Sequence, residues 1–238
     1  MGYLLILQRI FSSSTIIQMT RPYKQLKALI FDMDGVLVNN HAFHQKAWIE
    51  FCRRYGIDLT PEEFSTKIFG GGNRDILERV FQKKLTEEEV KVMAFEKEKL
   101  YRELHAPYLE PTKGVREFLA QAVEYGFLTA VATAAPAENL DFVLKNTGLE
   151  QFFKVKVDDS MVQRSKPEPD IYLYCTNKLG IPPENCLVFE DSLTGIRAAQ
   201  SAGIRVVGVA TSLDHDQLSH TWKVIDNFEQ ISVKDLIQ

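Results

Sequence analysis

Four segments of the sequence carry side chains that together could bind a phosphoryl group and a divalent cation. They supply two acidic clusters, a hydroxyl and an ammonium, namely Asp32 with Asp34, Thr133, Lys166, and Glu190 with Asp191. Mg²⁺ prefers carboxylate and carbonyl oxygens together with waters and substrate phosphate. A phosphoryl group in transfer needs hydrogen-bond donors and positive charge on its equatorial oxygens. The composition of this set is therefore suited to phosphoryl transfer with Mg²⁺ as the cofactor.

Apolar runs typical of buried strands lead into these groups, and helical patterns separate the runs. The strand-like runs are at residues 26–32, 127–133, 154–158, 186–190 and 204–209, with an edge strand at 223–225. The helical patterns are at residues 113–125, 136–147, 168–179 and 193–202. This alternation predicts an α/β fold, a doubly wound parallel sheet with a Rossmann-like core. Ligands bind beyond the carboxyl ends of such strands, so we expect the four groups at one edge of the sheet.

The segment between the first two strands breaks this alternation. It contains four helical patterns and no convincing strand, with the helices near residues 41–55, 61–68, 73–83 and 86–105. Thr60 and Thr86, each followed by acidic residues, are typical helix starts. About 65 residues are far too many for one crossover connection. We therefore predict a helical cap domain at residues 40–109, inserted into a catalytic core formed by residues 23–39 and 110–238.

The first 22 residues are predicted to be a loose tail. The apolar run from Tyr3 to Leu7 is too short to span a membrane. It lacks the positive start of a signal peptide, and its faint likeness to a transit peptide is the weaker interpretation. Met19 could be the true start of the protein. No other segment of the sequence is apolar enough to cross a membrane.

Composition and charge limit the kinds of molecule that the protein is expected to bind. The 238 residues carry a formal net charge of -4 and no long basic run, which argues against nucleic acid as a partner. The three cysteines form no CxxC motif, so reduced thiols and a cytoplasmic location are expected. We expect a monomer that binds a small phosphorylated metabolite.

The sequence resembles the haloacid dehalogenase-like hydrolases over residues 26–212, and within them the branch of β-phosphoglucomutase and sugar-phosphate phosphatases. Four motifs carry the resemblance in the expected order: Asp32-Met33-Asp34-Gly35-Val36-Leu37, Thr133 after Ala130-Val131-Ala132, Ser165-Lys166-Pro167-Glu168-Pro169-Asp170, and Phe189-Glu190-Asp191-Ser192. Each motif alone is a weak signal. A lone Thr133 or Lys166 would be an ordinary strand-end or loop residue, and Ser192 also suits the cap of the helix that follows.

The resemblance implies a role for each matched position. Asp32 attacks phosphorus and becomes an aspartyl-phosphate, while Asp34 acts as the general acid and base. Asp32, the backbone carbonyl of Asp34, and Asp191 hold Mg²⁺, and Glu190 helps directly or through water. Thr133 and Lys166 bind the phosphoryl oxygens, and Lys166 also offsets the repulsion between Asp32 and an anionic substrate.

The cap contributes weaker signals from the same resemblance. His44 matches a histidine that reaches back to the acid/base aspartate, and Arg74 matches a phosphate-binding arginine, so both are candidate substrate-binding residues. Lys97 matches a lysine that faces the hinge, but its helix is rich in charge and a solvated position is the favoured interpretation. His41 is expected to matter less than His44.

Three functions remain open from the sequence. The pattern of the mutases places a lysine just before the glycines of the cap loop, whereas residues 68–72 offer no cation before Arg74. This departure favours a phosphatase over a β-phosphoglucomutase-type mutase. A domain that only binds a phosphorylated ligand is the third possibility, and the intact motifs argue against it. A calcium loop is excluded, because Val36 and Leu37 occupy positions that need an oxygen ligand and a glycine.

Overall fold

A computed structural model describes residues 26–68 and 72–237 of the chain. The core is one sheet of six parallel strands in the order β3-β2-β1-β4-β5-β6. In chain order the strands are β1 (Ala28–Phe31), β2 (Leu128–Ala132), β3 (Val155–Val157), β4 (Cys186–Glu190), β5 (Arg205–Val209) and β6 (Lys223–Ile225). The predicted α/β fold is confirmed. The predicted loose tail at residues 1–22 lies outside the described residues.

The two central strands β1 and β4 are buried on both sides, as their continuous apolar runs require. All four residues of β1 are fully buried; Leu29 and Phe31 face one apolar cluster, and Ala28 and Ile30 face the other. Phe31 is in register with Val131 of β2 and with Phe189 of β4. The carboxyl ends of the three central strands are therefore level, and the residues that follow them are neighbours.

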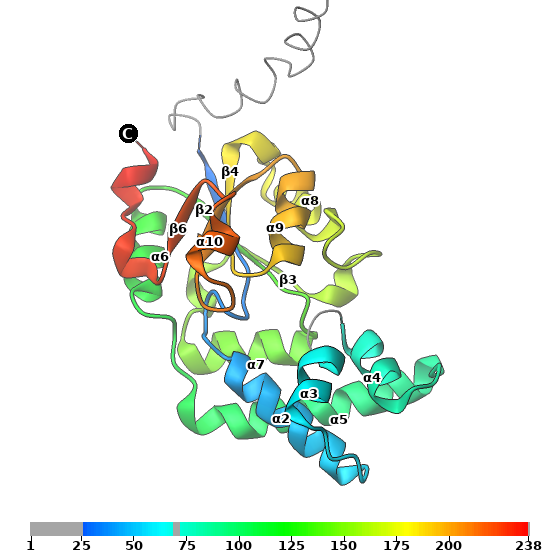
Figure 1. Cartoon of the computed structure of the whole chain (residues 1–238). Coiled ribbons are helices and arrows are strands. Elements are labelled where there is room, and N and C mark those ends of the chain that lie inside the picture. The colour runs from blue at the N-terminus through cyan, green and yellow to red at the C-terminus, as the bar shows by residue number, and fades with distance from the viewer. Residues whose placement is uncertain (1–25, 69–71, 238) are drawn as a thin grey trace, which may run out of the picture.

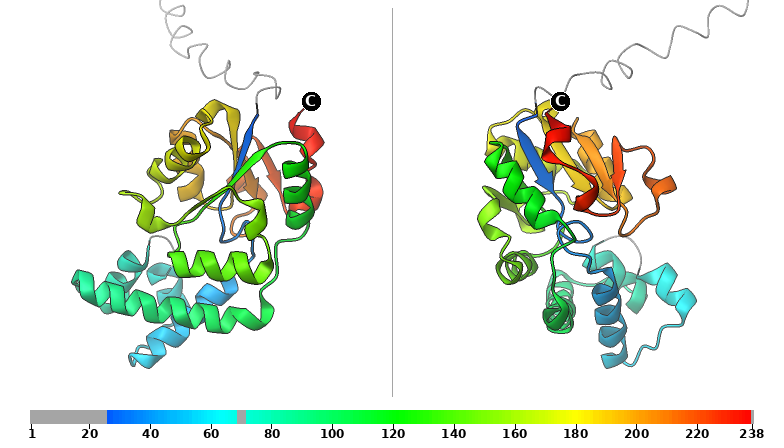
Figure 2. Two further views of the ribbon diagram at one scale, coloured as in Figure 1. Left: turned by 180° about the vertical axis from the view of Figure 1, so that it is seen from behind. Right: turned by 90° about the vertical axis from the view of Figure 1, so that its left-hand side faces the viewer.

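Helices cover both faces of the sheet (Figure 2). α6 (Val115–Glu124) and α7 (Ala137–Thr147) contribute to the cluster on the Phe31 side, and α8 (Asp170–Leu179) and α9 (Leu193–Ser201) to the cluster on the Ile30 side. α10 (His215–Leu218) precedes β6. Short 3-10 helices complete the described chain: η2 (Ala106–Tyr108), η3 (Glu150–Phe152), η4 (Asp159–Met161), η5 (Pro183–Asn185), η6 (Phe228–Gln230) and η7 (Val233–Leu236).

Four helices between β1 and β2 form a separate layer below the carboxyl ends of the strands (Figure 1). They are α2 (His41–Arg54), α3 (Pro61–Lys67), α4 (Asn73–Phe81) and α5 (Glu87–His105), and we call them the cap. Thr60 and Thr86 are the N-caps of α3 and α5, each in a capping box, as predicted. The cap has an apolar cluster of its own, with Trp48, Phe51 and Tyr101 among its buried members. The predicted domain boundaries near residues 40 and 109 stay a prediction.

The cap packs against α7 of the core through buried polar contacts. Asn139 is fully buried; its side-chain nitrogen donates to Glu98 Oε2 at 2.7 Å, and its Oδ1 accepts from Arg102 at 2.6 Å. Phe142, three positions further along the same helical face, contacts both the cap cluster and a core cluster. Glu98 and Arg102 lie one turn apart on α5, so Asn139 bonds to two successive turns of the cap. No helix within the described residues is both long enough and apolar enough to cross a membrane.

Asn139→Ala should lower the free energy of unfolding by about 2–3 kcal/mol, because it leaves the buried carboxylate of Glu98 without one of its donors. Urea unfolding followed by circular dichroism measures the change. Asn146→Ala is the matched control on the same helix, since Asn146 is exposed and bonds only to the backbone oxygen of Phe142 in the described contacts. The control should change stability by less than about 0.5 kcal/mol. Equal effects of the two substitutions would contradict the contact described.

Candidate active site

The centre of the site is a buried ammonium between two carboxylates. Lys166 lies in the loop before α8, and its Nζ is 2.6 Å from Asp32 Oδ1 and 2.7 Å from Glu190 Oε1. Burial lowers the pKa of Lys166, but Asp32 and Glu190 raise it further than burial lowers it. The side chain is therefore an ammonium at neutral pH. The predicted convergence of these three segments on one sheet edge is present.

Asp32 is surrounded by more negative than positive charge. Burial raises its pKa, Lys166 offsets part of that rise, and the carboxylates of Glu190, Asp191 and Asp34 raise the pKa again. One ammonium does not neutralise this cluster. A bound divalent cation would supply the missing positive charge.

Glu190 is held by donors on every side. Oε1 accepts from Lys166 and from the hydroxyl of Tyr172 at 3.0 Å, and Oε2 accepts from the backbone N–H groups of Asp191 and Ser192 at 2.9 Å. Burial raises the pKa of Glu190, but Lys166 and these hydrogen bonds lower it to a greater extent. A Cβ on Gly195 would lie 1.6 Å from Oε1, so only glycine lets α9 start this close. Glu190 is thus an anion fixed in place, and it fixes Lys166.

The geometry fits a divalent metal ion. Asp32, Glu190 and Asp191 each offer a carboxylate oxygen, and these atoms lie within 4.8 Å of one another. Gly35 brings the loop after Asp34 against Asp191; its φ is +80°, and a Cβ there would lie 1.9 Å from Asp191 Oδ2. Hard oxygen ligands in a cluster of surplus negative charge are what Mg²⁺ requires. The role of the Asp34 carbonyl as a ligand stays a prediction.

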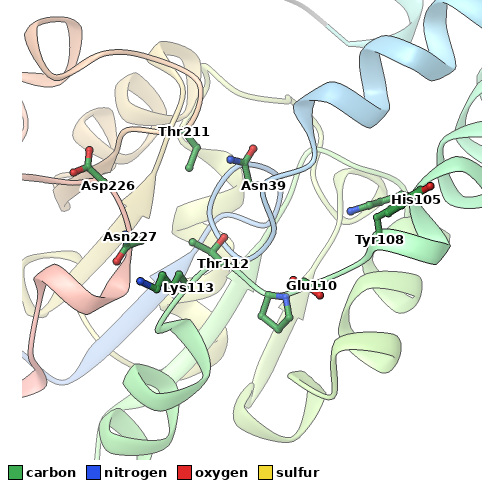
Figure 3. A pocket seen from close by; sticks show the side chains of 10 residues that line it. Asn39, His105, Tyr108, Glu110, Thr112, Lys113, Thr211, Asp226 and Asn227 are labelled. Carbon is green, nitrogen blue, oxygen red and sulfur yellow. The ribbon is translucent and has the colours of Figure 1, made fainter.

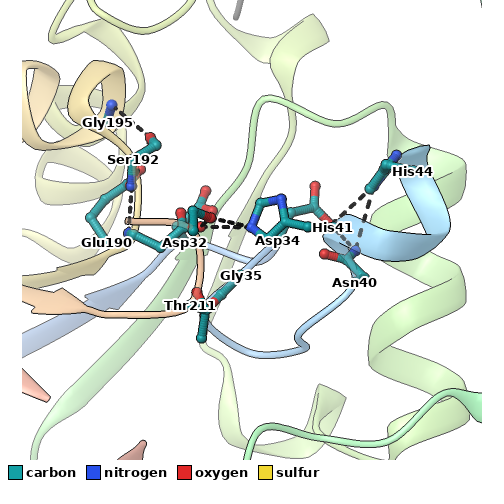
Figure 4. A network of polar contacts seen from close by, with 12 residues as sticks. Asp32, Asp34, Gly35, Asn40, His41, His44, Glu190, Ser192, Gly195 and Thr211 are labelled. Carbon is teal, nitrogen blue, oxygen red and sulfur yellow. Dashed lines mark hydrogen bonds and ion pairs between the residues drawn. The ribbon is translucent and has the colours of Figure 1, made fainter. Parts of the chain in front are cut away.

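Asp34 receives polar contacts from the first turn of the cap (Figure 4). The side-chain nitrogen of Asn40 donates to Asp34 Oδ1 at 2.6 Å, and His44 Nε2 lies 3.7 Å from the same oxygen. Burial raises the pKa of Asp34, but His44 and Asn40 lower it by more, so the net pKa is below its ordinary value. The side chain is 24% exposed. It is therefore an accessible carboxylate next to the more deeply buried Asp32.

Thr133 follows β2 and is buried, as its predicted place at the strand end requires. Its hydroxyl accepts a hydrogen bond from the backbone N–H of Ala135 at 3.0 Å, and its own N–H donates to the carbonyl of Val157. Its oxygen therefore accepts a hydrogen bond within the turn, while its hydroxyl proton can be donated to another group. Binding of a phosphoryl oxygen by Thr133 stays a prediction. Ser192 is the N-cap of α9 and accepts from the N–H of Gly195, as the sequence suggested.

Lys97 of α5 is buried between the cap helices. Lys97 is 2% exposed, so the favoured interpretation of a solvated position is wrong. Its Nζ lies 2.5 Å from Glu98 Oε1, 3.4 Å from His44 Nδ1 and 4.9 Å from the centre of the Trp48 ring. The charge of α5 suggested solvent, but α2 packs against the face of α5 that carries Lys97, and Glu98 neutralises the lysine there.

His41 contacts the acidic cluster that could hold the metal ion, although it was expected to matter less than His44. Its Nε2 lies 2.9 Å from Asp191 Oδ2, and it also contacts the hydroxyl of Ser212 in the loop after β5. Burial lowers the pKa of His41, but Asp191 raises it more. No local signal marked this histidine, because its partner is 150 positions away. Asn40 and Tyr101, which share a hydrogen bond of 2.6 Å beside Asp34, were missed for the same reason.

No contact among the described residues joins Arg74 to the acidic cluster of Asp32, Glu190 and Asp191. Its guanidinium is 2.6 Å from Glu87 Oε2, 3.6 Å from Glu78 Oε1 and 3.2 Å from the carbonyl of Leu85, all within the cap. The glycine loop from which Arg74 was expected to reach the substrate includes residues 69–71, which lie outside the described residues. A substrate-binding role for Arg74 stays a prediction.

The comparisons with known proteins agree with this fold. The family model described as haloacid dehalogenase-like hydrolase matches residues 29–209. A phosphatase of phosphorylated carbohydrates from Thermotoga maritima is 35% identical over 194 residues, which cover 79% of this chain and 88% of that protein. A haloacid dehalogenase hydrolase of family IA from Entamoeba histolytica superposes with a TM-score of 0.83 at 28% identity, over 89% of this chain and 98% of that one.

The chain belongs to the haloacid dehalogenase-like hydrolases, which confirms the resemblance and the enzyme class expected from the motifs. A β-phosphoglucomutase from Clostridium difficile is also similar, with a TM-score of 0.77 at 27% identity over 89% of this chain and 95% of that one. Relatives of this chain thus include both a phosphatase and a mutase.

Asn40→Ala should raise the pKa of Asp34, because it removes the donor at 2.6 Å that favours the carboxylate. If Asp34 is the general acid, the descending limb of the pH profile of kcat/KM moves to higher pH. Tyr101→Phe is the matched control, since it removes another partner of the Asn40 amide without removing a donor to Asp34, and it should move this limb less. An unchanged limb in Asn40→Ala would contradict the role given to Asp34.

Proposed function

We propose that this protein is a Mg²⁺-dependent phosphatase that hydrolyses a small phosphorylated carbohydrate through an aspartyl-phosphate on Asp32. The observation that carries the proposal is the Lys166 ammonium, held 2.6 Å from Asp32 by a fixed and buried Glu190. A carboxylate cannot easily approach a phosphate dianion because the two repel each other. An adjacent ammonium that touches the nucleophile removes much of that barrier.

In the first half of the reaction, an oxygen of Asp32 attacks phosphorus and the bond from phosphorus to the sugar oxygen breaks. Lys166 and Thr133 donate hydrogen bonds to the phosphoryl oxygens as charge develops on them. Asp34 gives a proton to the leaving sugar oxygen. Since its neighbours hold Asp34 as a carboxylate in the free enzyme, it takes up that proton when the phosphate dianion adds negative charge to the site.

In the second half, Asp34 accepts a proton from water as that water attacks the phosphorus of the intermediate. The low pKa of Asp34 returns once the leaving group has departed, so the same group then acts as a base. Bound Mg²⁺ would neutralise the phosphoryl charge, with Asp32 and Asp191 as ligands. Glu190 already accepts from five donors, and it would therefore contribute through a water.

The substrate class is inferred from the name of a relative and from the position of His44 between the cap and the core. The Thermotoga maritima relative is named for phosphorylated carbohydrates, and a carbohydrate phosphate is a small metabolite that the cap can cover. His44 lies between Asp34 and Lys97 at the surface where cap and core meet, and we place the sugar near it. A monomer is part of this proposal. So is a cytoplasmic location, which is supported by three free and buried thiols, namely Cys52, Cys175 and Cys186.

A phosphosugar mutase is the second candidate. The similar β-phosphoglucomutase structure and the contact of half-buried His44 with buried Lys97 favour it. The two functions share the first half of the reaction and differ in the acceptor, which is water for a phosphatase and a sugar hydroxyl for a mutase. The lack of a cation between Ile68 and Arg74 still favours the phosphatase.

Purified protein with Mg²⁺ should release inorganic phosphate from a panel of sugar and polyol phosphates, and chelation with EDTA should abolish the release until Mg²⁺ is restored. Asp32→Asn should abolish turnover, since an amide cannot form the intermediate. Quantitative conversion of β-glucose 1-phosphate to glucose 6-phosphate with negligible phosphate release would establish the mutase instead. No turnover of either kind in the parent protein would favour a domain that only binds phosphorylated ligands.

A further inference from the structure

A cavity lies at the joint between the cap and the core (Figure 3). Its volume is about 330 Å³, and both connections between the two parts line it: Asn39 from the first, and residues 110–113 from the second. Tyr108 at the end of the cap and Thr211 and Asp226 of the core complete the walls. A cavity of this size accommodates a molecule as large as a monosaccharide.

This hinge pocket is separate from the catalytic cluster but contacts the loop that carries it. None of Asp32, Lys166 or Glu190 lines the pocket. The hydroxyl of Thr211, by contrast, donates to the carbonyl of Gly35 at 2.6 Å, and the backbone N–H of Thr112 donates to the carbonyl of Leu37 at 2.8 Å. Two walls of the pocket therefore touch the loop that follows Asp34.

Thr112 presents an unpartnered polar group to the pocket. Its side chain is 8% exposed, and its hydroxyl oxygen has no hydrogen-bond partner among the described residues. A buried hydroxyl without a partner is uncommon and marks a place where a water or a ligand completes the hydrogen bonding. Thr112 also lies within the second connection, where a bound molecule would touch the hinge itself.

The charges around the pocket argue against an anionic ligand. The cation in its wall, Lys113, is paired with Glu229 at 2.8 Å, while Glu110 contributes negative charge and the Asp226 carboxylate contacts His215 Nε2 at 2.7 Å. Burial lowers the pKa of His105 to about 4, so this side chain is neutral at pH 7. A phosphorylated sugar, which suits the catalytic site, would be repelled here.

The remaining groups match a neutral molecule with several hydroxyls. Thr112, Thr211, Asn39 and Asn227 offer hydroxyl and amide groups, which donate and accept hydrogen bonds in the way that sugar hydroxyls require. The Tyr108 side chain is 68% exposed, and its ring stacks on Phe43 at 5.7 Å between ring centres, which leaves its other face open. An open aromatic face beside convergent polar groups is typical of small-molecule sites.

We propose that the hinge pocket binds a neutral sugar or polyol, the dephosphorylated product class of the enzyme, and that occupation restrains the cap. The identification of the ligand as product rests on the proposed function, whereas the existence of the site does not. A ligand between Thr112 and Tyr108 would bridge the second connection to the end of the cap. Since cap motion admits substrate and releases product, bridging should slow turnover without blocking the catalytic site.

Binding is tested on the full-length protein with D-glucose and D-glucitol as probes, by ligand-observed NMR titration in the presence of saturating inorganic phosphate. The phosphate occupies the catalytic site and leaves the hinge pocket free. We expect saturable binding that is weakened at least tenfold in Thr112→Val and in Tyr108→Ala. Thr66→Val, at an exposed threonine of α3, is the matched control and should bind as the parent does. Because Tyr108 is exposed, its variant tests the site even where Thr112→Val fails to fold.

Kinetics provides the second readout. A probe at saturation should lower kcat without raising KM in the parent, and it should have no effect on Tyr108→Ala. Absence of saturable binding by either probe would overturn the proposal and leave water as the partner of Thr112. If phosphate abolishes binding of the probe, or if the probe inhibits only by raising KM, the probe binds at the catalytic site. Either result would also overturn the proposal. Saturable binding in a protein without phosphatase activity would uphold the site and refute the proposed function alone.

Discussion

The rest of the site depends on one buried interaction, the Lys166 ammonium between Asp32 and Glu190. Removing three charged groups from water is costly, and the attraction between them compensates only if their geometry is held. The hydrogen bonds from Tyr172 and from the backbone after β4 hold Glu190, and Glu190 holds Lys166. The parallel register of β1 and β4 brings the two carboxylates to the same level. The apolar core thus sets the positions of the charges around Asp32.

A second set of polar contacts ties this centre to the cap. His41 reaches Asp191, and Asn40 and His44 reach Asp34, all from the first turn of α2. A further contact joins the core to the cap, because Asn139 of α7 bonds to Glu98 of α5. Asp191 and Asp34 therefore each have a partner whose position depends on the cap. Under the proposed function, movement of the cap would therefore change the surroundings of both carboxylates.

The fold could be predicted from the sequence, and so could the convergence of Asp32, Lys166 and Glu190 on one edge of the sheet. Strand ends, capping residues such as Thr60 and Thr86, and the groups that follow each strand are all local signals, and parallel strands gather such groups at one edge. Contacts that depend on tertiary packing were not predictable. The burial of Lys97 depends on how α2 and α5 pack, and the pairing of His41 with Asp191 joins residues 150 positions apart. The hinge pocket likewise combines two connections that are distant in sequence.

The central claim is that Asp32, prepared by Lys166, accepts the phosphoryl group. Enzyme mixed with substrate, quenched within a turnover and treated with borohydride tests it directly, because borohydride reduces an acyl phosphate to an alcohol that peptide mass spectrometry locates. We predict the reduced product at position 32, formed about 10²–10³-fold more slowly in Lys166→Met and at the parent rate in Lys178→Met, a change at an exposed lysine of α8. Phosphate release without any reduced product at position 32, or with the product at another carboxylate, would contradict the account.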